Sequence, residues 1–159
     1  IYVNLKGRDT HGTGERGPDQ ETVKRQIIDG LSGITDTASG TVAINRVFDV
    51  NEVHSRGPYQ AGGLDLIVGY NRGYRASWES ATGQVTASVF TDNTKSWSGD
   101  HCVDPRLVPG VLFANRAVRD DDPGIMDLAP TILTLFGVGV PAHMTGRVLD
   151  VAVAGSPAA

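Results

Sequence analysis

The sequence predicts an α/β sandwich with a mainly parallel sheet. Short apolar runs typical of strands alternate along the chain with helical patterns, and glycine-rich loops separate them. The chain has 159 residues, 20 of them glycine, which fits one domain with many turns. Internal repeats and low-complexity segments are absent from the sequence.

Composition argues against two classes of partner. The net charge is −4 and there is no basic stripe, so we expect no nucleic acid partner. No apolar run reaches the roughly 18 residues needed to cross a bilayer. Cys102 is the single cysteine, so an internal disulfide is impossible and cysteine usage does not indicate a compartment.

The chain opens on an expected strand. Residues 1–5 are apolar and partly β-branched, which predicts a strand from the first residue. Because native domains seldom begin inside a core strand, we expect the chain to be a piece of a longer protein cut upstream of Ile1. Residues 6–18 form a glycine-rich loop that matches neither a P-loop nor a dinucleotide-binding fingerprint. Its His11 is expected to be an exposed loop histidine, with metal ligation as the alternative.

A helix is predicted after this loop. Pro18 and the acidic residues that follow it are typical of a first helical turn. Lys24 and Arg25 lie off the apolar face, so we expect both in solvent. The apolar face is formed by four residues at positions i, i+4, i+5 and i+8 along the helix: Val23, Ile27, Ile28 and Leu31.

Four further strands are expected. Residues 41–53 alternate in hydrophobicity, and residues 64–70 form a continuous run typical of a strand buried on both faces. Residues 85–90 and 110–114 are shorter apolar runs of the same kind.

The segment after residue 70 is rich in amphipathic side chains. We expect Arg72 and Arg75 to pair with local carboxylates, with an anionic substrate as the alternative. Trp78 and Trp97 either stack on a nucleoside or phenyl group or pack at the rim.

The loop at residues 97–105 carries the clearest candidate chemistry. Gly99 and Pro105 indicate irregular backbone, and open α/β sheets bind ligands beyond the ends of their strands. The alternative on spacing alone is a turn capped by aspartates, in which His101 is an ordinary loop histidine. The loop and its approach combine one imidazole with three carboxylates: His101, Asp92, Asp100 and Asp104.

The last element is a helix that begins near Asp127. We expect Asp127 to cap it and Pro130 to lie in its first turn, where the missing N–H does no harm. Gly137 fits the position just past its end. Residues 1–150 then form the domain, and residues 151–159 form a frayed tail.

These residues carry a resemblance to the alkaline phosphatase superfamily, which includes sulfatases, phosphodiesterases and cofactor-independent mutases. The C-terminal signature is Asp127-Leu-Ala-Pro-Thr-Ile-Leu133, followed by Leu135-Phe-Gly-Val138, Pro141, Met144 and Gly146-Arg147. Three further matches resemble the bacterial form of the type I phosphodiesterase/nucleotide pyrophosphatase branch: Asn4-Leu-Lys-Gly-Arg8, Val68-Gly-Tyr70 with Gly73-Tyr-Arg75, and Trp97-Ser-Gly-Asp-His101.

The resemblance implies an architecture and a metal site. The chain would be the C-terminal part of a metal-dependent hydrolase domain with an alkaline-phosphatase-like α/β/α sandwich. Members of this superfamily hold two divalent metal ions, usually zinc, and His101 occupies the place of the last metal-binding histidine. Asp92, Asp100 or Asp104 would accept a hydrogen bond from its other ring nitrogen. Cys102 is expected to be a small buried hydrophobe, with metal contact as the alternative.

The resemblance also implies an activity. We expect metal-dependent hydrolysis of phosphate esters, of the phosphodiester or nucleotide pyrophosphate type, on a small phosphorylated substrate. The Thr or Ser nucleophile and the other ligands would lie upstream of Ile1, in the missing N-terminal part of the domain. One histidine cannot complete a catalytic zinc site, so these residues alone should be inactive. The alternatives are a sulfatase or phosphomutase of the same superfamily, or a non-catalytic binding relative. A periplasmic or extracellular location would follow from the family alone.

Overall fold

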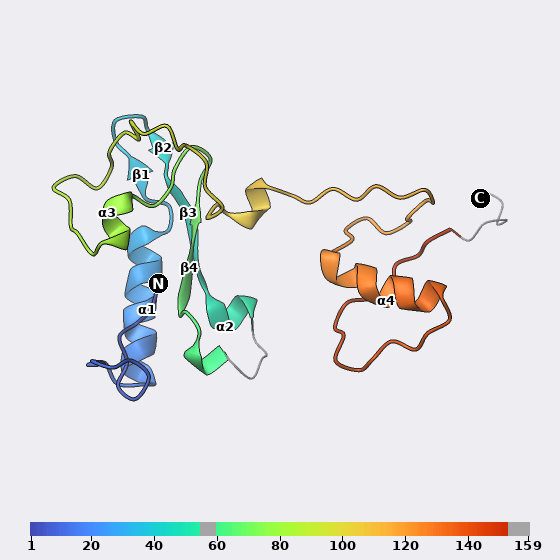
Figure 1. The fold of residues 1–159 in the computed structure, drawn as a ribbon. Coiled ribbons are helices and arrows are strands. Elements are labelled where there is room, and N and C mark those ends of the chain that lie inside the picture. Colours follow the sequence, from blue (N-terminus) through green and yellow to red (C-terminus); the bar gives the residue numbers. More distant parts are fainter. Residues whose placement is uncertain (55–59, 153–159) are drawn as a thin grey trace. The chain divides into compact units, whose positions relative to one another are not determined.

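The computed structural model describes residues 1–54 and 60–152 (Figure 1). The chain divides into two units, residues 1–109 and residues 110–159, and each is considered separately. The tail expected at residues 151–159 lies outside the described residues from residue 153 onward. The longest helix in the described part of the chain has 14 residues, and none there is long and apolar enough to cross a membrane.

Helix α1, Pro18–Leu31, begins where the sequence predicts and includes all four residues of the expected apolar face. Pro18 stands at its first position, where a backbone N–H has no helical partner, and Asp19 and Glu21 lie in the first turn. Its buried residue is Lys24, which is 1% exposed, so the prediction that Lys24 lies in solvent is wrong. The ammonium of this lysine is paired with two carboxylates, those of Asp49 and Glu21, each at 2.7 Å.

The first unit contains two small antiparallel sheets. Strands β1, Thr35–Asp36, and β2, Thr41–Val42, form a short hairpin. Strand β3, Ile44–Asp49, pairs with β4, Leu66–Tyr70, with a register shift between Ile44 and Arg46, and Phe48 lies opposite Ile67. Helix α1 packs along β3 (Figure 1).

Short helical segments fill the connections of this unit. Helix α2, Val50–Val53, begins where the sequence predicts that a strand continues, because the Asp49 side chain accepts a hydrogen bond from the Asn51 N–H and caps it. Helix α3, Trp78–Ala81, follows β4, and single 3-10 turns occupy Gln60–Gly62 and Pro105–Leu107.

The N-terminal segment contributes to the core without forming a strand ladder. Val3 and Leu5 are buried, and the terminal amino group of Ile1 donates to the Leu66 carbonyl at 2.7 Å. The Val3 N–H, however, donates to the Asp65 carboxylate instead of a strand backbone. The expected strand at residues 1–5 is therefore limited to an isolated bridge between Leu5 and Gly14.

The second unit is built around helix α4, Ile125–Leu135. The predicted N-cap, Asp127, is instead the third helical residue, and Gly124 is the N-cap. The Asp127 carboxylate accepts hydrogen bonds from the Gly124 and Arg147 N–H groups, both at 2.9 Å. Gly137 follows the helix with a φ of 69°, as its expected position requires.

Two expected strands are wrong, and the expected parallel sheet is not formed within the described residues. Residues 85–90 and 110–114 are irregular. Their apolar side chains are open to solvent, as for Val85, 98% exposed, and Phe113, 91% exposed. A strand requires a partner for its backbone groups, and no described segment pairs with either run. The mixed α/β class is confirmed, and its sheets are antiparallel.

Candidate functional site

The loop that carries His101 is attached to the end of β4. The Asp104 N–H donates to the Tyr70 carbonyl at 2.9 Å, and Val103 forms an isolated parallel bridge with Tyr70. His101 lies two residues before this anchor and is exposed. Among the described residues its ring makes no hydrogen bond.

Arg75 braces this loop from the segment before α3. Its guanidinium donates to the Gly99 carbonyl at 3.1 Å and lies 3.4 Å from an Asp100 oxygen. The prediction that Arg75 pairs with a local carboxylate is therefore confirmed. Asp100 also accepts the Cys102 N–H at 3.0 Å. This N–H, the His101 N–H and the Arg75 charge hold the pKa of Asp100 below its usual value, although partial burial acts in the opposite direction.

Asp104 is fully buried and pairs with Arg106. Arg106 donates to both Asp104 oxygens, at 3.0 and 2.6 Å. This pairing lowers the pKa of Asp104 against the effect of burial. Of the three aspartates proposed to orient His101, Asp100 lies beside it in the loop, Asp104 is held by Arg106, and Asp92 is exposed.

The described residues do not assemble a metal site on their own. No three His, Cys, Asp or Glu side chains in the described ranges are close enough to share a metal ion. Asp100 and Asp104 already have cationic partners, so neither is free to join His101 around a metal ion. Cys102 is exposed, so the prediction that it is a small buried hydrophobe is wrong. Desolvation of its thiol and the Asp100 charge raise its pKa.

Aromatic side chains and cations surround the same loop. The Arg75 guanidinium lies 5.2 Å and the Lys95 ammonium 5.7 Å from the centre of the Trp78 ring. Trp97 donates through its indole N–H to the Gly99 carbonyl at 3.0 Å. Both tryptophans are about half exposed or more, so the loop has an aromatic and basic border.

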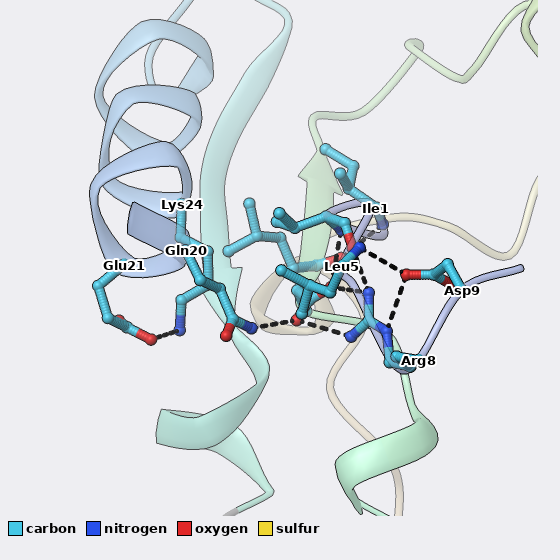
Figure 2. A network of polar contacts seen from close by, with 10 residues as sticks. Ile1, Leu5, Arg8, Asp9, Gln20, Glu21 and Lys24 are labelled. Atoms are coloured by element: carbon cyan, nitrogen blue, oxygen red, sulfur yellow. Dashed lines mark hydrogen bonds and ion pairs between the residues drawn. The ribbon is translucent and has the colours of Figure 1, made fainter. Parts of the chain in front are cut away.

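A second polar cluster lies at the other end of β4 and centres on Asp65. Its two carboxylate oxygens accept hydrogen bonds from two Arg8 nitrogens, from the Val3 N–H and from the Gln20 amide (Figure 2). Burial alone would raise the pKa of Asp65, but these donors and the Arg8 charge hold it below its usual value. Sequence reasoning missed Asp65, whose signal was a carboxylate inside the apolar run at residues 64–70.

The comparisons relate part of the chain to one class of enzyme, phosphoglycerate mutases. The chain is 37% identical over 71 residues to the 2,3-bisphosphoglycerate-independent phosphoglycerate mutase of Shewanella baltica strain OS185. It is 35% identical over 69 residues to the same enzyme of Shewanella sediminis strain HAW-EB3. The two matches cover 45% and 43% of this chain and 12% of each relative. No protein-family model and no solved structure matches the chain.

These relatives agree with the resemblance to the alkaline phosphatase superfamily, but not with its phosphodiesterase branch. Cofactor-independent mutases are among the members of the superfamily that the sequence resembles, so these relatives fall within the range of enzymes that the resemblance covers. The reported relatives are mutases and not phosphodiesterases.

Proposed function

We propose that this chain is part of a phosphoryl-transfer enzyme of the alkaline phosphatase superfamily that acts as a phosphomutase on a small phosphate ester. The observation that carries the proposal is the 37% identity over 71 residues to a phosphoglycerate mutase. This similarity favours the phosphomutase alternative over the phosphodiesterase that the sequence motifs suggest.

In this proposal His101 is a metal ligand. Its ring is exposed, its loop is anchored at the end of β4, and Arg75 restrains the residues directly before it. A bound divalent metal would supply positive charge for the oxygens of a transferring phosphoryl group. The chain's own contribution is to hold the imidazole at the strand end.

The remaining parts of the site would come from residues outside this chain. The chain spans 12% of the length of the relatives it matches, and one histidine is too few ligands for a catalytic metal. We therefore assign the Thr or Ser nucleophile, the other ligands and the parallel α/β/α sandwich to the complete protein. The metal is proposed only as a divalent ion.

Phosphodiester hydrolysis is the second candidate. The motifs that end at Arg8, Arg75 and His101 favour it because they resemble the type I phosphodiesterase branch. The two activities differ in the fate of the phosphoryl group, which a mutase returns to a hydroxyl of the substrate and a hydrolase gives to water.

The test measures both activities in the complete protein that contains this chain. Interconversion of 2- and 3-phosphoglycerate is followed by ³¹P NMR, and release of nitrophenol from bis(p-nitrophenyl) phosphate measures diester hydrolysis. We expect isomerisation that requires a divalent metal and falls at least about tenfold in His101→Ala. His54→Ala is the matched control, because His54 is exposed in the same unit and lies outside the loop.

Each outcome separates the candidates. Diester hydrolysis without isomerisation would replace the mutase proposal by the second candidate. An enzyme with neither activity, or one in which His101→Ala and His54→Ala behave alike, would overturn the role proposed for this loop.

A further inference from the structure

A cavity of about 460 Å³ lies beside the Asp65 cluster. Its volume is within the range of about 300–1,000 Å³ that small-molecule sites occupy. Leu5 and Leu64 supply part of its apolar lining. Its polar lining comes from Arg8, Arg16, Gln20, Asn51, Gln60 and Asp65.

The Asp65 carboxylate, which carries the negative charge in this cavity, is already saturated with hydrogen bonds. Each Asp65 oxygen accepts two hydrogen bonds, one from Arg8 and one from either the Gln20 amide or the Val3 N–H. A carboxylate with four donors has no lone pair left for a cation. Arg8 is largely committed as well, because four of its five N–H groups donate to Asp65, Asp9 and the Val3 carbonyl. Figure 2 shows Arg8 and Gln20 converging on this centre from the N-terminal loop and from α1.

Arg16 is the charged side chain of the cavity lining that remains available to a ligand. Its side chain is exposed at the cavity and forms no hydrogen bond or ion pair with any of the residues described, 1–54 and 60–152. The side-chain amide oxygen of Asn51 accepts a hydrogen bond from the Gln60 side-chain NH₂ at 2.8 Å, which leaves the Asn51 NH₂ group as a donor. The groups left over therefore include the Arg16 guanidinium and the Asn51 amide N–H donors, a combination that suits an oxyanion.

We propose that this cavity is an anion site that takes a phosphate group, with Arg16 as its cation. It is separate from the His101 loop, because Asp65 directly precedes β4 and the loop is attached to Tyr70 at the last residue of that strand. Five strand residues place the two ends about 15 Å apart. The proposal does not rest on the proposed function, since it uses none of the same residues.

Inorganic phosphate is the probe, titrated by isothermal calorimetry at low ionic strength with EDTA present. The complete protein is used in a His101→Ala background, which removes the contribution of the loop. Arg16→Gln should weaken phosphate binding by about tenfold or more, because a charge-assisted hydrogen bond is lost. Arg25→Gln is the matched control: Arg25 is an exposed arginine of α1 that lines a different cavity. We expect the Arg25→Gln variant to bind phosphate with the same affinity as the parent protein.

Glycerol 3-phosphate, titrated in the same way, identifies the source of the phosphate group. Tighter binding of the ester would support a phosphorylated metabolite, and equal binding would support recognition of the phosphate group alone. Equal losses in Arg16→Gln and Arg25→Gln would indicate non-specific attraction and overturn the proposal. Absence of saturable binding in the His101→Ala background would overturn it as well, and circular dichroism establishes that each variant is folded.

Discussion

Asp65 is the residue whose loss should cost the first unit most. Its side chain is 7% exposed and that of Arg8 is 10% exposed, so the ion pair is largely removed from water. Asp65→Asn keeps the volume but leaves the Arg8 guanidinium without its main counter-charge. We expect the free energy of unfolding to fall by about 3 kcal/mol, measured by urea denaturation. Asp29→Asn, at an exposed position of α1, should change it by less than about 0.5 kcal/mol. Similar losses in both variants would contradict this role.

Gly146 is constrained by the close approach of the backbone of another segment. A Cβ at this position would lie 2.1 Å from the Met126 carbonyl oxygen, so alanine forces the backbone apart. We expect Gly146→Ala to lower the free energy of unfolding by about 1–3 kcal/mol. Gly30→Ala, inside α1 with open space around the position, should instead raise it by about 0.5–1 kcal/mol. Thermal unfolding followed by circular dichroism measures both, and equal shifts would contradict the steric argument.

The Thr131 hydroxyl is one of the groups that hold helix α4 to the C-terminal segment, beside the Asp127 carboxylate. The buried Thr131 Oγ1 accepts the Leu149 N–H at 2.9 Å and donates to the Asp127 carbonyl at 2.5 Å. Thr131→Val keeps the shape but leaves a buried N–H without a partner, so we expect a loss of about 1–3 kcal/mol. Thr131→Ser retains the hydroxyl and should lose less. Urea denaturation of the two variants tests this, and a valine variant as stable as the serine variant would refute it.

The elements that the sequence predicts well are those whose signals are local. The start of α1 follows from Pro18 and the acidic first turn, and Gly137 marks a residue just past α4. Lys24 could not be placed from periodicity, because its burial depends on Asp49, 25 residues away. The runs at 85–90 and 110–114 have strand composition, but strands depend on non-local partners.

In the candidate site, too, features with a local sequence signal could be predicted, and those that depend on distant residues could not. The sequence identifies His101 and its loop from glycine, proline and the carboxylates, and the role of His101 as a ligand remains a prediction. The pairing of Arg75 with Asp100 joins residues 25 positions apart and was expected only as a local carboxylate contact. The Asp65 cluster joins the N-terminal loop, α1 and the start of β4, so no single stretch of sequence reveals it.

The molecule as a whole should be sensitive to acid. The native contacts lower the pKa of six aspartates, mainly because each accepts backbone N–H groups or an arginine: Asp9, Asp36, Asp65, Asp100, Asp104 and Asp127. A carboxyl group with a lower pKa in the folded state stabilises that state above its unfolded pKa. This contribution is lost as the pH falls through the folded value.

The urea midpoint should therefore stay nearly constant between pH 7 and pH 5 and fall steeply below about pH 4, the ordinary range of aspartate. Far-ultraviolet circular dichroism is the measurement, because Trp78 and Trp97 are exposed and report weakly on unfolding. The Asp65→Asn variant should show a smaller fall than the parent, since one of the shifted carboxyl groups has been removed. A midpoint that is flat from pH 7 to pH 3 would mean that these aspartates have the same pKa in the folded and unfolded chains. The contacts described for Asp65 and Asp104 would then contribute nothing to stability.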